Sequence, residues 1–124
     1  MALDFSFSPE HEAVRETIRR FARERMAPLV TQAEETETFP RELFAQWGEI
    51  GLLGVRYPQA DGGSGMDKIA DCIIREEMSY VCQAFASSWS AHTHLGMPSR
   101  LGTKPSRRRD QVYFGRQAES ASRA

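Results

Sequence analysis

The stretch SPEHEAVRETIRRFARERM, residues 8–26, predicts an amphipathic α-helix with a clear beginning. Ser8 is a favoured N-cap residue, and Pro9 suits the first helical position because the N–H that it lacks would have no partner there. Apolar residues then recur three or four positions apart, the spacing that aligns side chains along one face of a helix. This apolar face contains Val14, Ile18, Phe21, Ala22 and Met26.

Two prolines and a glycine punctuate the chain after this stretch. Pro28 is expected to interrupt the helix because its ring clashes with the preceding turn, with a further turn or two after it. Pro40 suits the first position of a second helix, and Gly51 is placed to end that helix in the left-handed conformation. Residues 52–57 are expected to follow as a short, buried, extended passage.

A third helix is expected from Asp67, running into a fourth that extends from Val81 to about Leu95. Residues 78–99 contain no Asp, Glu, Lys or Arg, and a helix that is neutral all round is expected to be enclosed by other parts of a protein. The stretch is long enough to suggest a membrane span, but its serines and histidines make it too polar for hydrocarbon. No segment before it shows the two-residue alternation of a half-buried strand. The predicted fold class is therefore all-α, a helical bundle over residues 5–97.

The formal net charge of -1 hides an asymmetry along the chain. Residues 1–98 carry 9 basic and 15 acidic side chains, whereas residues 99–124 carry 7 basic and 2 acidic ones. Few large apolar residues occur in the basic segment, so residues 98–124 are expected to form an atypical, disordered tail. Nucleic-acid binding by this tail is an alternative that lacks support, because no aromatic interleaving or recognisable fold accompanies the arginines. No nucleic-acid or membrane partner is expected.

Several polar and sulfur-containing residues have simple structural interpretations. Cys72 and Cys82 are expected to be reduced, buried thiols of a cytoplasmic protein, since no targeting segment is visible. The glycine-rich stretch 58–65 is expected to be a loop without a phosphate site, because it lacks the lysine and hydroxyl of a Walker loop. His92 and His94 point in different directions on a helix, so no metal site is expected, and hydrogen bonding near the helix end is the favoured interpretation. The two tryptophans, Trp47 and Trp89, are expected in the core.

Three stretches together resemble the acyl-CoA dehydrogenase family, over roughly residues 5–103. They are FPREL (39–43) leading to GEIGLLG (48–54), then PQADGGSGMD (58–67), and finally EEMS (76–79) leading to AHTHLG (91–96). Each is weak alone, but their order and spacing make the combination specific. The resemblance implies a three-domain, homo-oligomeric flavoenzyme in which this segment is the N-terminal helical domain.

The resemblance also implies where the chemistry lies. In the family FAD lies between a middle β-domain and a C-terminal helical bundle, and a glutamate of that bundle removes the α-proton of an acyl-CoA thioester while hydride passes to the flavin. No carboxylate of this chain matches that glutamate, and the flavin-contacting motifs are missing. We therefore expect no catalytic, cofactor-binding or metal-binding residue in the chain, no FAD bound by it alone, and no activity by itself.

What the N-terminal domain contributes in the family is one wall of the acyl pocket. Ser87, Ala91 and Leu95 are spaced four apart, so they share a helix face, and by resemblance they are the candidate pocket-lining residues. Two of them are small, which would leave room for a longer or branched acyl chain. The alternative, that small residues merely let helices pack closely, stays open.

The family pattern is lost after Leu101-Gly102-Thr103. We hypothesise that the domain is truncated there or that the reading frame changes, because hydrophobic period, charge balance and family pattern disappear together. The other functions consistent with the sequence are a fragment of a related flavin monooxygenase or oxidase and a non-catalytic helical interaction module.

Overall fold

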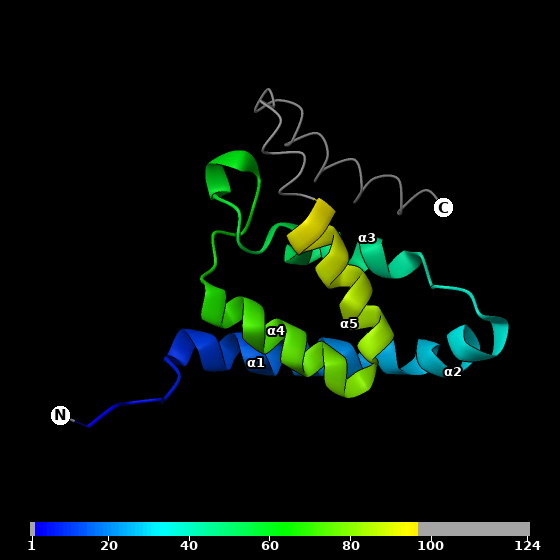
Figure 1. Cartoon of the computed structure of the whole chain (residues 1–124), viewed down its shortest axis with the longest axis horizontal. Helices are drawn as coiled ribbons and strands as arrows, with labels where there is room; N and C mark the ends of the chain where they lie inside the picture. Colours follow the sequence, from blue (N-terminus) through cyan, green and yellow to red (C-terminus); the bar gives the residue numbers. More distant parts are fainter. Residues whose placement is uncertain (1, 97–124) are drawn as a thin grey trace.

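The computed structural model describes residues 2–96 of the chain, and within them every regular element is helical (Figure 1). The all-α prediction is confirmed for this part. The elements, in chain order, are α1 (Pro9–Phe21), η1 (Ala22–Met26), α2 (Ala27–Thr36), α3 (Glu42–Glu49), η2 (Leu52–Gly54), η3 (Gln59–Asp61), α4 (Lys68–Val81), α5 (Gln83–Ser90) and η4 (Ala91–Gly96). Here η1 and η4 are π-helical turns, and η2 and η3 are 3₁₀ turns. The predicted tail, residues 98–124, lies outside the described residues.

Helix α1 begins as the sequence predicts. Ser8 Oγ accepts a hydrogen bond from the His11 N–H at 3.2 Å, and His11 Nδ1 accepts one from the Ser8 N–H at 3.4 Å. This reciprocal capping box satisfies two backbone donors that the first turn leaves without helical partners. Pro9 follows in the first turn.

The interruption expected at Pro28 lies just before it, in the turn η1. A π turn widens the helix there, and such a bulge is one of the usual ways for a helix to accommodate a local disturbance. The chain then continues as α2 for ten residues, longer than the turn or two that we expected, and ends at Glu37, whose φ of 50° is left-handed.

Helices α1 and α4 lie side by side, and α5 packs against α4 and crosses over the pair (Figure 1). Asp67 joins the N-terminal ends of α1 and α4. Its carboxylate accepts a hydrogen bond from the Ala70 N–H of α4 at 2.8 Å and lies 2.8 Å from Nε2 of His11 in α1. The Ala70 N–H first, and His11 second, hold the pKa of Asp67 below its usual value. The start of α4 at Asp67 was predicted correctly.

The core lies between α1, α3, α4 and α5. Trp47 and Trp89 are both fully buried, which confirms the prediction for each. Phe39, in the link before α3, contacts the rings of Trp47 and Phe85 with centroids 6.2 and 5.6 Å apart. The buried apolar cluster consists of Ile18, Ala22, Met26, Leu43, Trp47, Leu52, Leu53, Val55, Ile74, Met78, Phe85, Ala86 and Trp89.

Two local predictions around α3 were wrong in detail. The helix begins at Glu42 with Arg41 as N-cap, so Pro40 precedes the helix instead of occupying its first position. Gly51 does adopt the predicted left-handed conformation, with φ of 78°. Residues 52–57 are buried in large part but are not extended, because η2 coils the chain immediately after Gly51.

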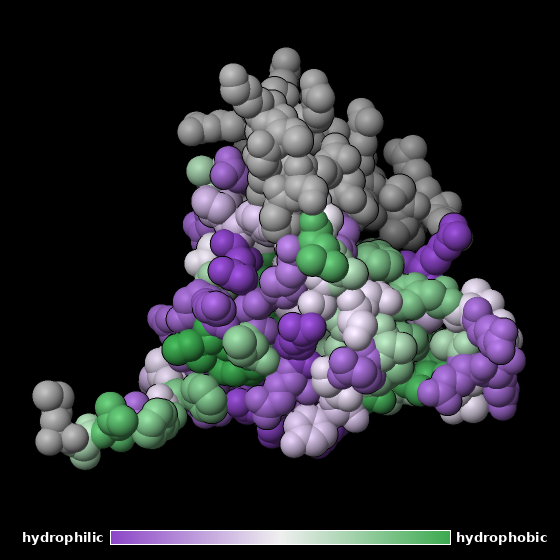
Figure 2. Space-filling view, in the orientation of Figure 1, coloured by the Kyte–Doolittle hydropathy of each residue, from purple (hydrophilic) through white to green (hydrophobic). Residues whose placement is uncertain are grey.

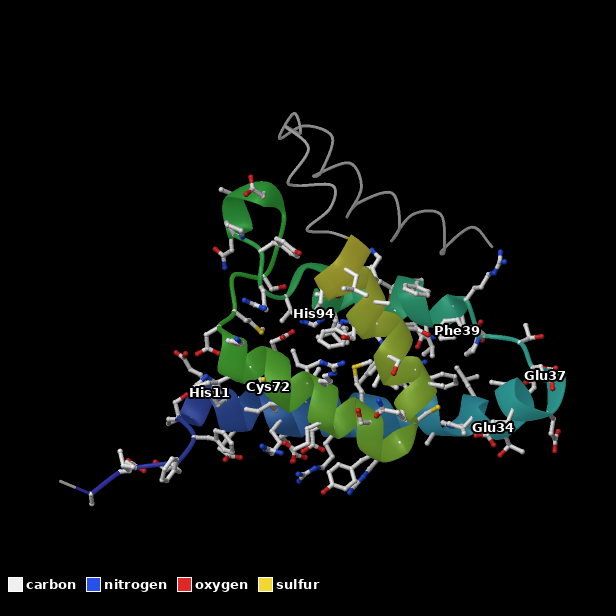
Figure 3. All side chains as sticks on the ribbon, viewed as in Figure 1. His11, Glu34, Glu37, Phe39, Cys72 and His94 are labelled. Carbon is white, nitrogen blue, oxygen red and sulfur yellow. The ribbon has the colours of Figure 1, made fainter. Side chains whose placement is uncertain are left out.

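The predicted burial of the two cysteines was also wrong. Cys72 is exposed and Cys82 is half-buried. Helix α4 buries Ile73, Ile74 and Met78, and helical geometry turns Cys72 to the outside. Figure 3 shows Cys72 on α4.

Within residues 2–96, no helix has the length and apolar character needed to cross a bilayer.

Candidate functional site

The candidate pocket wall, Ser87, Ala91 and Leu95, lies on one exposed face of the helix formed by α5 and η4. All three side chains are exposed, and Leu95 is 71% exposed. The opposite face is buried and carries Phe85, Ala86, Trp89, Ser90 and Thr93. Within this chain the helix is therefore enclosed on one side only, and enclosure of the other side by further parts of a protein stays a prediction. Much of the surface over α5 is weakly polar or apolar (Figure 2).

The buried face is fixed to the domain by hydrogen bonds as well as by packing. The Trp89 indole N–H donates to the Leu52 carbonyl at 2.9 Å. The Tyr57 hydroxyl donates to the Thr93 carbonyl at 3.0 Å, and burial raises the pKa of this phenol, which keeps it protonated and able to donate. These bonds set the direction in which the exposed face points.

His94 bonds a carboxylate on another helix. Its Nε2 lies 2.8 and 3.0 Å from the two carboxylate oxygens of Asp71, and Figure 3 shows it between η4 and α4. Its Nδ1 lies 3.1 Å from both the hydroxyl and the carbonyl of Ser90. A neutral ring accepts from the hydroxyl and a charged ring donates to the carbonyl, so Ser90 offers a partner in either state. The interpretation of His94 as a hydrogen-bonding residue near a helix end is confirmed.

The glycine-rich loop uses its backbone donors internally. The N–H groups that would face a phosphate in a cradle instead donate to carbonyls of the preceding segment. They join Ser64 to Gly54 at 2.9 Å, Gly65 to Tyr57 at 2.8 Å and Met66 to Val55 at 2.8 Å. This agrees with our interpretation of the stretch as a structural loop. These bonds attach the loop to the segment that carries Tyr57, whose hydroxyl in turn bonds the Thr93 carbonyl of η4.

At Gly63 the loop backbone lies so close to the carbonyls of Tyr57 and Gly54 that only glycine fits. A Cβ there would collide with the carbonyl oxygen of Tyr57 and would lie 2.7 Å from that of Gly54. We expect Gly63→Ala to lower the free energy of unfolding by about 1–3 kcal/mol, because backbone atoms must shift to admit the methyl group. Urea unfolding monitored by circular dichroism measures the loss. Unchanged stability would contradict this close packing.

A second charged cluster joins α1 to α4. Glu77 is 4% exposed, and its carboxylate lies 2.7 Å from Arg15 Nη1 and 3.0 Å from Arg19 Nη2. The hydrogen bond from Arg19, and then that from Arg15, hold the pKa of Glu77 below its usual value despite its burial. Because every charge in this cluster is paired with another from the same domain, its role is structural.

No metal site is formed by the described residues: within residues 2–96, no three His, Cys, Asp or Glu side chains are grouped to hold an ion.

The hydrogen-bond partners of η4 that the sequence did not predict are Asp71 and Tyr57. Asp71 lies within α4 and Tyr57 follows η2, and neither position has a local motif that links it to η4. Only folding brings the two residues to that turn. A polar residue at a buried helical position, as Asp71 is, was the one available signal.

Comparison with known proteins agrees with this architecture. The acyl-CoA dehydrogenase N-terminal domain family matches residues 8–109. The short-chain specific acyl-CoA dehydrogenase of Clostridium acetobutylicum is 37% identical over 93 residues, which are 75% of this chain and 24% of that protein. The acryloyl-CoA reductase (NADH) of Anaerotignum propionicum is 31% identical over 114 residues, which are 92% of this chain and 28% of that protein.

The fold is also found among solved structures. A chain from the structure described as the electron transferring flavoprotein of Acidaminococcus fermentans superimposes with a TM-score of 0.80 and 25% identity, covering 96% of this chain and 31% of that chain. The present chain spans about a quarter of the length of the relatives above. With a helical architecture and a family match over most of its length, the chain belongs to the acyl-CoA dehydrogenase family and corresponds to its N-terminal domain.

Proposed function

We propose that the outer face of α5 and η4 forms one wall of an acyl pocket in an FAD-dependent acyl-CoA dehydrogenase. The observation that supports this most strongly is an exposed, uncharged face on a helix whose opposite side is buried and hydrogen-bonded to the rest of the domain. Ser87, Ala91 and Leu95 point outward, while Trp89 fixes the buried side of the same helix. An acyl chain requires an apolar surface of this kind, because buried charge next to hydrocarbon is unfavourable.

The chemical step belongs to other parts of the protein in this proposal. FAD supplies a hydride acceptor in such enzymes. The described residues do not fit that cofactor, because the backbone donors of the glycine-rich loop are bonded to Gly54, Val55 and Tyr57. Glu77 is occupied by two arginines and faces α1, so it is not placed to remove a proton from a substrate. The domain by itself therefore has no turnover. By resemblance to the family, we also propose that the whole enzyme is a cytoplasmic homo-oligomer.

The size of the face indicates the substrate class. With Ser87 and Ala91 as small residues, the wall leaves room for a longer or branched acyl chain and makes contact through Leu95. A hydrophobic pocket discriminates by about 1–3 kcal/mol for each methylene that it accepts or excludes. A bulky side chain at Ala91 is thus expected to change which acyl chains are accepted.

A hybrid enzyme tests the wall. The N-terminal domain of the Clostridium acetobutylicum dehydrogenase is replaced by residues 2–96 of this chain, and flavin reduction is measured with acyl-CoA substrates of increasing length. We expect Ala91→Phe to raise KM for the longer substrates by about tenfold or more, with little change for the shortest. Ala27→Phe is the matched control, since Ala27 is an exposed alanine at the start of α2.

Flavin absorbance shows whether the hybrid has assembled, and a smaller exchange of residues 79–96 carries the same face if the larger one does not assemble. An unchanged chain-length profile in the Ala91→Phe hybrid would exclude the pocket wall. Helix packing by small residues would then account for Ser87 and Ala91.

A further inference from the structure

The last turn of the proposed wall depends on polar contacts for its position. Within η4, Thr93 is the buried residue, whereas Leu95, which follows His94, is 71% exposed. Apolar packing holds α5 through the buried Phe85 and Trp89, whereas η4 packs the ring of His92 against Phe44, with centroids 6.1 Å apart. A π turn that buries little apolar area of its own depends on polar contacts as well to stay in one conformation.

Two side chains from outside the helix provide these contacts. Tyr57 reaches the Thr93 carbonyl, and Asp71 of α4 reaches His94. Asp71 is 7% exposed, and the imidazole of His94 lies against both of its oxygens. A mostly buried carboxylate that loses its partner loses part of its stabilisation, so the pair favours the conformation in which His94 points at α4.

The ring is also held on its other sides. Trp89 contacts it edge to face, with centroids 5.5 Å apart, and Ser90 bonds Nδ1 in the preceding turn. The imidazole therefore connects the firmly packed turn at Trp89, the buried Asp71 and the weakly packed turn that carries Leu95.

We infer that His94 is a positioning residue, and that its bond to Asp71 fixes η4 so that Leu95 ends the acyl pocket at a defined depth. This inference rests on the proposed function for the role of Leu95, while the positioning itself is a property of the chain. Loss of the bond would let η4 move outward and would loosen the selection of acyl length, without touching the reacting atoms.

Hydrogen exchange on the full 124-residue chain tests the positioning directly. We expect His94→Ala to speed exchange of the amides of residues 91–96 by about tenfold or more, while those of α1 change little. His94→Gln should restore most of the protection, because its amide N–H₂ can donate to Asp71. Equal exchange in wild type and His94→Ala would overturn the inference, as would a failure of the glutamine to restore protection.

The hybrid dehydrogenase separates this inference from the proposed function. There we expect His94→Ala to broaden the range of acyl chains through KM, with kcat for the preferred substrate unchanged and with recovery in His94→Gln. If Ala91→Phe shifts the profile but His94→Ala does not, the pocket wall stands and the role of His94 fails. If Ala91→Phe has no effect, the pocket wall fails, whatever His94 does to exchange.

Discussion

Trp89→Ala is expected to remove a large part of the domain's free energy of unfolding. The side chain is fully buried in the core cluster, and its indole N–H bonds the Leu52 carbonyl at 2.9 Å. Truncating a buried tryptophan costs about 3–5 kcal/mol, and the carbonyl left without a partner adds to that loss. Small domains have only about 5–15 kcal/mol of stability in total. Urea unfolding followed by circular dichroism measures the difference.

Trp89→Phe separates the two contributions. Phenylalanine retains most of the apolar contact but lacks the indole N–H, so the loss of stability should be clearly smaller than for alanine. Because the lost hydrogen bond joins α5 to η2, Trp89→Phe should weaken the contact between these two elements more than it affects the packing of α1. A Trp89→Ala protein with a cooperative transition at the wild-type urea concentration would contradict the proposed anchoring of α5.

Removing both arginines that face Glu77 is the second change with a large expected effect. In the Arg15→Met, Arg19→Met variant, a carboxylate that is 4% exposed loses the hydrogen bonds at 2.7 and 3.0 Å. Breaking a buried ion pair from one side costs about 3–5 kcal/mol, because the remaining charge has no compensation. Adding Glu77→Met to this variant should recover much of the stability, since the unpaired charge is then gone.

The pH dependence follows from the depressed pKa of Glu77. The hydrogen bonds from Arg19 and Arg15 stabilise the ionised carboxylate in the folded protein, and in the unfolded chain a glutamate has its ordinary pKa of about 4.3. The stabilisation is therefore complete above that pH and is lost as the pH falls through the lower, folded-state pKa of Glu77. Urea unfolding from neutral to acidic pH should show a steeper loss for wild type than for Glu77→Gln. Parallel curves would contradict the coupling.

Local sequence signals predicted the parts of the fold that local interactions determine. The capping residue Ser8, the first-turn Pro9, the left-handed Gly51 and the N-cap Asp67 all lie where the pattern placed them. Each works within a few residues of itself, so its effect can be read without the rest of the molecule. The details that failed depend on more distant contacts. Residues 52–57 coil through η2 instead of extending, and their carbonyls accept hydrogen bonds from residues 64–66, a contact that no local signal reveals.

The candidate site also has one part that local sequence predicts and one part that depends on contacts between distant residues. The shared face of Ser87, Ala91 and Leu95 follows from helical spacing, and in the structure all three lie exposed on the helix formed by α5 and η4, while their role in a pocket stays a prediction. Asp71 and His94 are 23 residues apart and meet only after α4 and α5 have packed. Neither residue belongs to a spacing motif, so no local rule could have paired them.

The central claim is that the outer face of α5 and η4 contacts the hydrocarbon end of an acyl-CoA. Photo-crosslinking tests it most directly, with the hybrid dehydrogenase and an acyl-CoA that carries a diazirine at the terminal carbon of a long acyl chain. The label is expected on the peptide that contains Ser87, Ala91 and Leu95, and saturation with unmodified acyl-CoA should suppress it. Labelling confined to other segments, with flavin reduction by the same probe intact, would contradict the account.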